Sequence, residues 1–180
     1  HGRVFAFQEW GSTKNSYATM NNNSLPDQFL KPKKSVSILI SSLNTKAIHV
    51  KECLESIKSQ MCHIFLEIIW INDGSDAMNT TILKKLLKDF ENTTRYCSVV
   101  YNENDGNKGI GFTLNKGILM CSNDLIIKMD SDDIMMPSRI KRQVDFMNAN
   151  PDIAICGGQI QMFHDNGLKA TKSNHPSITF

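Results

Sequence analysis

The chain has 180 residues, and its 20 basic and 18 acidic side chains leave a formal net charge of +2. This near balance excludes a polybasic nucleic-acid-binding tail and an acidic solvating chain as the main theme of the protein. The content of 41% hydrophobic and 21% charged residues is typical of one folded globular domain. The longest apolar runs, at 36–40 and 64–71, are far shorter than the roughly 20 residues that span a bilayer. We therefore expect no nucleic-acid partner and no membrane span.

The cysteine pattern bears on the compartment. The five cysteines form an odd number, and no two have the spacing of a C-x-x-C pair. Such a pattern favours scattered reduced thiols in a core over a disulfide framework or a structural zinc site. Together with the lack of an apolar signal segment behind His1, it favours a cytoplasmic protein.

Residues 1–34 differ in composition from the rest of the chain. The stretch 12–24 is polar and rich in Asn, with neither a helical nor a strand period, and Lys31-Pro32-Lys33-Lys34 follows it. This composition predicts an irregular or partly ordered leader over 1–34 and a folded domain over 35–180. Within the leader, Val4, Phe5, Phe7 and Trp10 could dock on the domain.

From residue 35 onward, short β-branched runs alternate with helical periods. Strands are predicted at 36–40, 64–71, 98–101, 125–129 and 153–156. Helices are predicted between them, at about 50–60, 82–90, 111–121 and 137–147. The segments 159–163 and 168–171 flank Asp165-Asn166-Gly167, which is a hairpin signal. This order predicts an α/β fold with a mostly parallel sheet, helices on both faces and a C-terminal β-hairpin.

In such sheets, ligands bind outside the carboxyl ends of the strands. The segments that follow the predicted strands are polar: Ser41-Ser42-Leu43-Asn44, Asn72-Asp73-Gly74-Ser75, Asn107-Lys108-Gly109 and Asp130-Ser131-Asp132-Asp133. We expect all four to project into one crevice.

The acidic run after the fourth strand is the sharpest local feature. Three carboxylates, those of Asp130, Asp132 and Asp133, lie within four residues and repel one another unless a cation sits among them. A hard divalent cation, with positions left open for a phosphate-bearing substrate, is the natural partner. The alternative is that the run caps a helix N-terminus, a role that suits Asp133 in front of the helix expected near Pro137.

Asp73 follows the second strand, where a carboxylate often accepts hydrogen bonds from a ribose or a base. The alternative is an ordinary turn, since Asn-Asp-Gly-Ser is turn chemistry in any protein. The chain has neither a Gly-x-Gly-x-x-Gly fingerprint nor a Gly-Lys-Ser/Thr loop, which disfavours a dinucleotide site and a P-loop.

Taken together, the motifs resemble the family 2 glycosyltransferases of the Rossmann-like GT-A fold. The resemblance covers about 35–163 and rests on the order and spacing of several short motifs. They are the first strand with its turn at 36–44, Ser56-Ile57-Lys58-Ser59-Gln60, Glu67-Ile68-Ile69, Asp73-Gly74-Ser75-Asp76, Asn107-Lys108-Gly109, Asn115-Lys116-Gly117-Ile118, Asp130-Ser131-Asp132 with Asp133, Pro137 and Arg139, Asn150-Pro151, and Gly157-Gly158.

The resemblance implies an inverting transfer of a sugar from a nucleotide-sugar, expected to be a UDP-sugar, with Mn²⁺ or Mg²⁺ as the cofactor. Asp132 would bind the metal that bridges the diphosphate, and Asp130 would lie beside it, near the ribose and the sugar. Asp73 would hold the nucleobase. The remaining candidates for donor contacts are Ser41, Ser42, Leu43, Asn44, Lys108 and Ser131.

The chain departs from the family pattern in two respects. The family's catalytic Asp or Glu lies beyond Gly157-Gly158, and no residue here matches it, so the domain at 35–180 is expected to be truncated on the acceptor side. The family's Ala-Arg before the second Asn is Thr113-Leu114 here, so that one phosphate-directed cation is missing unless Lys108 compensates. The acceptor, whether glycan, protein or lipid, is not identified.

Two alternatives stay open. The chain is either the donor-binding half of a longer enzyme, or a non-catalytic nucleotide-binding or scaffold module derived from one. A phosphotransfer domain of receiver type has less support, because it needs an acidic pair after the first strand, where Ser41 and Ser42 stand.

Overall fold

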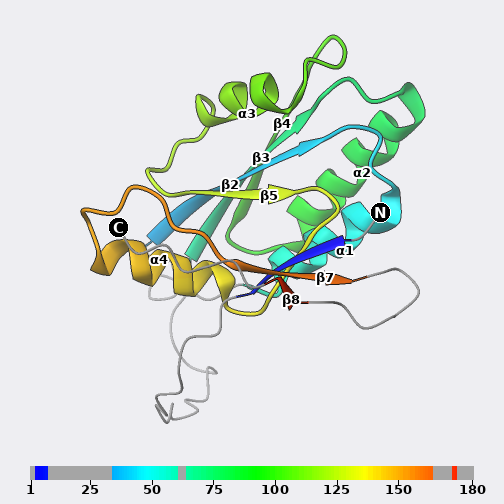
Figure 1. Ribbon diagram of the computed structural model, residues 1–180. Helices are drawn as coiled ribbons and strands as arrows, with labels where there is room; N and C mark the ends of the chain where they lie inside the picture. Colours follow the sequence, from blue (N-terminus) through cyan, green and yellow to red (C-terminus); the bar gives the residue numbers. More distant parts are fainter. Residues whose placement is uncertain (1–2, 8–33, 61–63, 164–171, 174–180) are drawn as a thin grey trace, which may run out of the picture.

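The computed structural model describes residues 3–7, 34–60, 64–163 and 172–173 (Figure 1). The strands are β1 (Arg3–Phe7), β2 (Lys34–Ser42), β3 (Ile64–Asn72), β4 (Cys97–Glu103), β5 (Ile126–Asp130), β6 (Ile134–Met135), β7 (Gln159–Phe163) and β8 (Lys172–Ser173). The helices are α1 (Ala47–Lys58), α2 (Ala77–Thr93), α3 (Ile110–Ile118) and α4 (Arg139–Ala149).

The main sheet has the order β4-β3-β2-β5, and all three of its pairings are parallel. Each crossover from β2 to β3 and from β3 to β4 runs through one helix, α1 and then α2. The alternation of strands and helices in the sequence therefore predicted the fold class correctly: the molecule is an α/β protein with a mostly parallel, Rossmann-like sheet.

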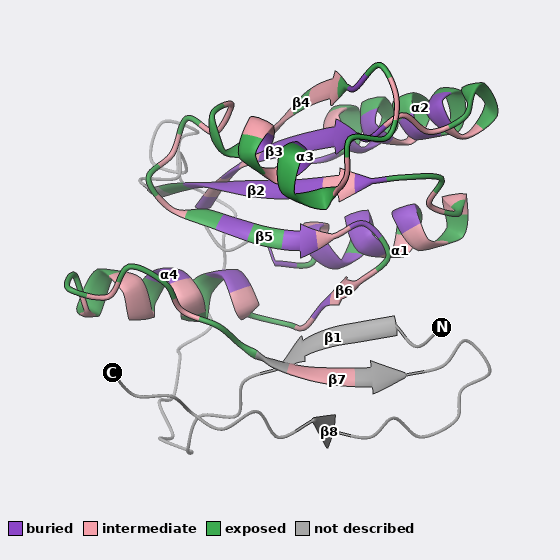
Figure 2. Ribbon diagram, turned by 45° about the horizontal axis from the view of Figure 1, so that its top comes forward, coloured by how far each residue is buried: buried purple, intermediate pink, exposed green. Residues whose placement is uncertain are grey.

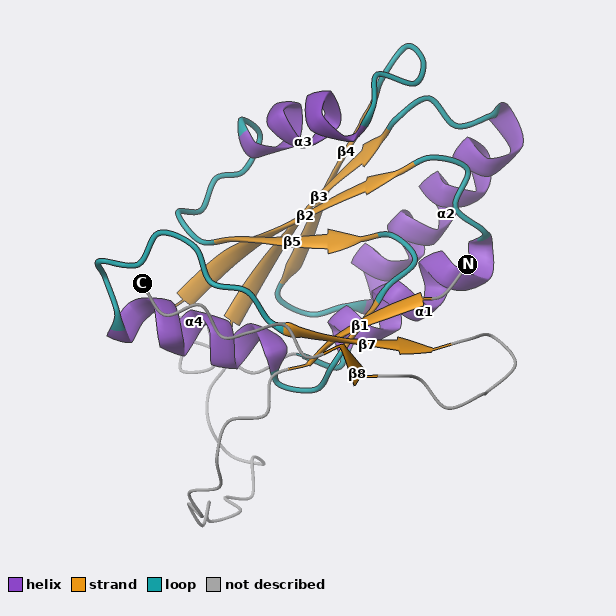
Figure 3. Cartoon of the chain, viewed as in Figure 1, coloured by secondary structure: helices purple, strands orange, loops and turns teal. Residues whose placement is uncertain are grey.

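Helices cover both faces of the main sheet (Figure 3). In β2 and β3, Ile38, Ile40 and Trp70 pack into the larger core with α1, α2 and α4, whereas Leu39 and Ile69 pack toward α3. This division follows from the two-residue period of a strand, which sends successive side chains to opposite faces. Since both faces are covered, β2 and β3 are almost entirely buried (Figure 2), which explains their continuous apolar runs.

A second sheet, in the order β6-β1-β7-β8, includes residues 3–7 of the predicted leader as a regular strand. There β1 pairs in parallel with β6 and antiparallel with β7, so Phe5 lies opposite both Ile134 and Gln161. The strand forms because segments about 130 and 155 residues downstream supply its hydrogen-bonding partners, a cause that local composition does not reveal. The rest of the predicted leader, at 8–33, lies outside the described residues.

The fifth predicted strand, at 153–156, is wrong: these residues carry no regular secondary structure, and Ile155 is 87% exposed. The β-branched run has no partner strand in the part of the chain that the structure describes. The first strand of the predicted hairpin, at 159–163, is present as β7, which pairs antiparallel with β8 through Ile160 and Ser173. The partner strand β8 lies at 172–173, and residues 164–171, which include the predicted turn and second strand, lie outside the described residues.

None of the helices in the described ranges has the length and hydropathy of a membrane-spanning segment. The cysteines whose side chains are described, Cys53, Cys97, Cys121 and Cys156, are free thiols. Burial, and secondarily the charge of Glu91, raises the pKa of Cys97 to about 12, so this thiol stays protonated at neutral pH.

Candidate functional site

The four polar segments that follow the strands lie along one edge of the main sheet, as expected. The register places Ser41 opposite Asp130 and Ser42 opposite Asn72. Two backbone hydrogen bonds extend this contact beyond the strands: Asp73 N–H donates to the Ser42 carbonyl at 2.8 Å, and Asn104 N–H donates to the Asn72 carbonyl at 2.9 Å. The turns after β2, β3, β4 and β5 therefore form one continuous rim.

On the β3–β4 side of this rim, Asp73 is only 5% exposed and is held by the loop after β4. Its Oδ1 accepts hydrogen bonds from Asn104 Nδ2 at 2.7 Å and from Lys108 N–H at 2.9 Å, and its Oδ2 accepts one from Gly109 N–H at 3.0 Å. Burial alone raises the pKa of Asp73, but these hydrogen bonds, that from Lys108 first, outweigh it, and the pKa lies below 3.8. Asp73 therefore anchors loop 104–109 as a carboxylate.

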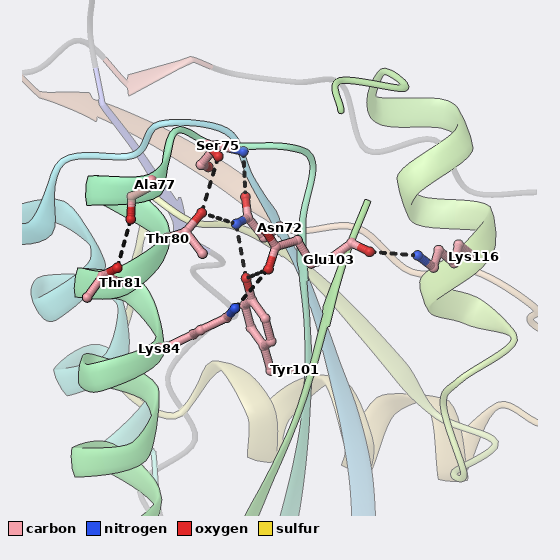
Figure 4. Close-up of polar contacts among 9 residues, drawn as sticks. All are labelled: Asn72, Ser75, Ala77, Thr80, Thr81, Lys84, Tyr101, Glu103 and Lys116. Carbon is pink, nitrogen blue, oxygen red and sulfur yellow. Dashed lines mark hydrogen bonds and ion pairs between the residues drawn. The ribbon is translucent and has the colours of Figure 1, made fainter. Parts of the chain in front are cut away.

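Hydrogen bonds from Lys116 hold one of the partners of Asp73 in place. Lys116 Nζ, on α3, donates to Asn104 Oδ1 at 2.7 Å, which turns the amide nitrogen of Asn104 toward Asp73. Lys116 Nζ also donates to the Glu103 carbonyl at 3.4 Å (Figure 4). Gly109, the N-cap of α3, has no side chain to cap the helix, so the Asp73 carboxylate provides an anion at this N-terminus.

Gly74 allows the loop after β3 to touch the loop after β4. It has φ +81°, and a Cβ at this position would lie 2.4 Å from the carbonyl carbon of Gly106. Only glycine satisfies both conditions, because the left-handed backbone and the close approach each exclude a side chain. Asp73 and Gly74 therefore hold the loop after β3 in direct contact with the loop after β4.

Beneath this rim, a polar cluster joins β3 and β4 to α2 (Figure 4). The Asn72 amide donates to Thr80 Oγ1 at 2.9 Å and to the Tyr101 hydroxyl at 3.0 Å. The Tyr101 hydroxyl in turn donates to Glu103, which pairs with Lys84 at 3.0 Å. Burial, opposed by the Asn72 contact and aided by the Glu103 carboxylate, raises the pKa of Tyr101 to about 12. The cluster fixes the strand ends from the face opposite α3.

The turn after β2 presents only part of its predicted donor-binding surface. The Ser42 hydroxyl is buried and accepts a hydrogen bond from Trp70 Nε1 at 2.8 Å. Asn44, with φ +50°, uses its Oδ1 to accept from Asp76 N–H at 2.9 Å. Ser41 is half-buried and Leu43 is 43% exposed. Leu43 and Asn44 are thus the exposed residues of this turn, Ser41 is partly accessible, and Ser42 is buried.

On the β5 side, the acidic turn faces solvent. The Asp130 side chain is 47% exposed, and its Oδ1 lies 2.5 Å from Lys128 Nζ. Asp132 is exposed, whereas Ser131 is 5% exposed and shares a 2.8 Å hydrogen bond with Thr45. A backbone hydrogen bond of 3.2 Å from Asp133 to the Asp130 carbonyl closes the turn. The turn therefore directs Asp130 and Asp132 outward and Ser131 inward.

The helix-capping alternative for Asp133 is not supported. The helix α4 begins at Arg139, and its N-cap is Ser138, five residues after Asp133. Arg139 is the cation that faces this part of the turn: its Nη2 donates to the Lys128 carbonyl at 3.2 Å. Burial lowers the pKa of Arg139, while the charge of Asp133 opposes this shift. The acidic run is therefore a turn supported by Arg139, separate from the helix terminus.

Two buried residues at the end of α1 support this turn, and sequence reasoning gave them no role. Gln60 Nε2 donates to the Met136 carbonyl at 2.8 Å, and its Oε1 accepts from Ile140 N–H at 3.4 Å. Ser56 Oγ accepts from Met135 N–H at 2.9 Å. Ser56 and Gln60 thus bind the backbone immediately after the acidic turn. The signal for them was present in the Ser-Ile-x-x-Gln motif, which was read only as a family marker.

The rim provides only part of what a divalent cation needs. Among the described residues, no group of three or more His, Cys, Asp and Glu side chains gathers as a complete metal site. The turn instead offers two outward carboxylates, those of Asp130 and Asp132. Mg²⁺ is typically bound by one or two carboxylates together with substrate phosphates and water, so this donor set fits an ion that arrives with a phosphate ligand.

Comparison with known proteins shows the family to which the chain belongs. The sequence profile of glycosyl transferase family 2 matches residues 37–179. The amylovoran biosynthesis glycosyltransferase AmsE of Erwinia amylovora is 29% identical over 137 residues, which are 76% of this chain and 49% of AmsE. The chain thus spans about half the length of this curated relative.

Two solved structures share the fold. One is the mannosyltransferase PcManGT from Pyrobaculum calidifontis in complex with GDP-Man and Mn²⁺, with a TM-score of 0.57 and 16% identity over 68% of this chain and 35% of that one. The other is S. aureus TarS 1–349 in complex with UDP-GlcNAc, with a TM-score of 0.53 and 18% identity over 65% of this chain and 32% of that one. The match of the family profile to most of the sequence, on this fold, shows that the chain belongs to glycosyl transferase family 2.

Proposed function

We propose that this chain forms the donor-binding part of a glycosyltransferase that moves a sugar from a UDP-sugar to a glycan, protein or lipid acceptor with inversion. The observation that carries the proposal is the outward pair Asp130 and Asp132 beside Ser41 on the rim of a family 2 domain. The fold neighbours support a nucleotide-sugar donor, since one was solved with UDP-GlcNAc and the other with GDP-Man and Mn²⁺.

In this proposal, Asp132 and Asp130 hold Mn²⁺ or Mg²⁺. A bound divalent ion would stabilise the negative charge that develops on the leaving diphosphate. Ser41 and Leu43 contact the nucleotide from the β2 turn, because Leu43 is exposed and Ser41 is partly accessible. Lys108 lies at the far end of the rim, where its ammonium pairs with Asp105 at 2.8 Å and can exchange that exposed partner for a phosphate.

The remaining candidates serve mainly as the frame of the site. Ser42, Asn44 and Ser131 already use their side chains in hydrogen bonds within the chain. Asp73 lies on the side where the family resemblance places the nucleobase, and its hydrogen bonds to loop 104–109 suit it to shape that end of the pocket. The domain over 35–180 then supplies donor binding, and the carboxylate base that deprotonates the acceptor comes from outside it.

Calorimetric titration of the 180-residue chain with UDP, UDP-glucose, UDP-GlcNAc and GDP-mannose, each with and without Mn²⁺, tests the proposal. We expect binding of the uridine nucleotides only when Mn²⁺ is present. Asp132→Ala should abolish this binding. Asp124→Ala, which removes an exposed carboxylate at the opposite end of β5, should leave it unchanged.

Three outcomes would count against the proposal. Equal binding by the Asp132→Ala chain would refute the metal assignment. A preference for GDP-mannose would refute the uridine assignment while keeping the donor site. Failure of every nucleotide to bind would leave the scaffold alternative in its place.

A further inference from the structure

Lys128 lies on the solvent-facing side of β5, two residues before Asp130 and on the same face of the strand. Its Nζ lies 2.5 Å from Asp130 Oδ1, and the two side chains are 48% and 47% exposed. A lysine thus stands beside the first carboxylate of the acidic turn. No role was assigned to it from the sequence.

The backbone of Lys128 is fixed even though its side chain is exposed. Lys128 pairs in register with Leu39, which is 2% exposed in the middle of the sheet. The Lys128 carbonyl also accepts a hydrogen bond from Arg139 Nη2 at 3.2 Å. Consequently, only the four-carbon stem of Lys128 is free to move, and its ammonium stays within reach of the acidic turn.

Lys108, the other lysine of the rim, is placed differently. It belongs to a loop rather than to a strand, and its ammonium pairs with Asp105, an 83% exposed side chain three residues away. Lys128 is therefore the better placed of the two for a group bound at Asp130 and Asp132.

We propose that Lys128 is a donor-binding residue that neutralises Asp130 before the metal binds and then moves its ammonium to the phosphate oxygens of the nucleotide-sugar. The inference rests on the proposed function and deepens it. It assigns to this chain the phosphate-directed cation that Thr113-Leu114 does not provide.

This role predicts that Lys128 has opposite effects on two affinities: it lowers the affinity for a divalent cation alone and raises the affinity for the nucleotide. Without nucleotide, the Lys128 ammonium competes with a divalent cation for Asp130, because both need the same carboxylate oxygens. With nucleotide, the same ammonium attracts the diphosphate. A residue that only stabilises the fold would weaken both kinds of binding together, or neither.

The test is Lys128→Met in the 180-residue chain, with Mn²⁺ alone and UDP at saturating Mn²⁺ as the two titrants. We expect the affinity for Mn²⁺ alone to rise about two- to fivefold, the range set by an exposed ion pair. The affinity for UDP should fall about tenfold, as expected for one hydrogen bond to a charged group. Lys128→Arg should retain the UDP affinity of the wild type.

Lys88→Met is the matched control, because Lys88 is likewise an exposed lysine in an ion pair, with Glu91 at 3.2 Å on α2. It should change neither affinity. If Lys128→Met leaves both affinities unchanged, or lowers both, the inference is overturned while the proposed function stands. A wild-type chain that binds no nucleotide with Mn²⁺ overturns the proposed function and this inference with it.

Discussion

Two carboxylates on the same rim have opposite environments. Asp73, at the end of β3, is 5% exposed and accepts hydrogen bonds from Asn104, Lys108 and Gly109. Asp130, at the end of β5, is half exposed, and its carboxylate pairs with the side chain of Lys128. The comparison teaches that the same residue type can be a buried part of the frame on one side of the sheet and an exposed carboxylate on the other, according to what the neighbouring loop supplies.

The largest expected difference is between the stabilities of two variants in which one of these carboxylates is replaced by alanine. Asp73→Ala leaves buried donors without an acceptor, so the free energy of unfolding should fall by about 3–5 kcal/mol. Asp130→Ala removes one exposed ion pair and should change it by less than about 1 kcal/mol. Urea unfolding of both variants at pH 7 measures the difference. Similar losses for the two would show that Asp130 is also part of the frame.

The next largest effect concerns the close approach of the loops after β3 and β4. Gly74→Ala forces a Cβ against the Gly106 backbone at a φ of +81°, and the unfolding free energy should fall by about 3 kcal/mol. Gly111 is the matched control, since it lies in the first turn of α3 with nothing within 4 Å of its added Cβ. Gly111→Ala should therefore stabilise the chain slightly. Equal behaviour of the two variants in thermal unfolding would contradict the tight contact.

The acidic turn after β5 is supported by Gln60, and removing this support should lower the free energy of unfolding by a smaller amount. Gln60→Leu removes the hydrogen bonds to Met136 and Ile140 while keeping the volume, so we expect a loss of about 2 kcal/mol. Gln60→Glu should be worse, because it places a carboxylate against the Met136 carbonyl. Unfolding measurements rank the two, and Mn²⁺-dependent nucleotide binding should weaken in both. A Gln60→Leu chain as stable and as active in binding as the wild type would leave the acidic turn without this support.

The smallest effect tests a carboxylate at the other end of the sheet. Glu67 accepts hydrogen bonds from Ser37 and Ser122. Burial raises the pKa of Glu67, but these bonds, that from the Ser122 side chain first, lower it below 4.5. A lowered folded pKa gives stability that is present above the unfolded value and lost as the pH falls through the folded one.

Glu67→Gln should therefore cost about 1 kcal/mol at pH 7. The difference from the wild type should shrink as the pH falls below about 4. Urea midpoints measured between pH 7 and pH 3 follow this convergence. A difference that stays constant with pH would mean that the hydrogen bonds do not depend on the ionised form.

The sequence was sufficient for the features that depend on local pattern. Alternating strands and helices predicted the parallel sheet, and the rule that ligands bind at strand ends predicted that Asp130 and Ser41 share one edge. The strand β1 and the absent strand at 153–156 could not be predicted in this way. In both cases the outcome depends on whether a distant segment offers a free edge, and such partners are not visible in a local window.

The directions of individual side chains could be predicted from the sequence only in part. Ser42 has the same parity as Ile38 and Ile40 in β2, so the two-residue period could have predicted that it faces the core, as its bond to Trp70 shows. No such rule applies to Asp73, whose burial depends on how loop 104–109 folds back over it. The buried role of Gln60 likewise appears only once α1 and the segment before α4 are packed together.

The strand order has a consequence for the order of folding events. Strand β2 pairs with β3, and β3 pairs with β4, so these pairings join consecutive strands of the chain. Strand β5 instead returns to β2 and pairs Ile126 with Ser37, about 90 residues earlier in the sequence. Closing so long a loop is slow relative to the local crossovers. A nascent chain that has reached the end of β4 therefore exposes one open edge of β2. The docking of β5 covers this edge and carries Asp130 to Ser41 in the same step, so these two strand ends come together only when the sheet is complete.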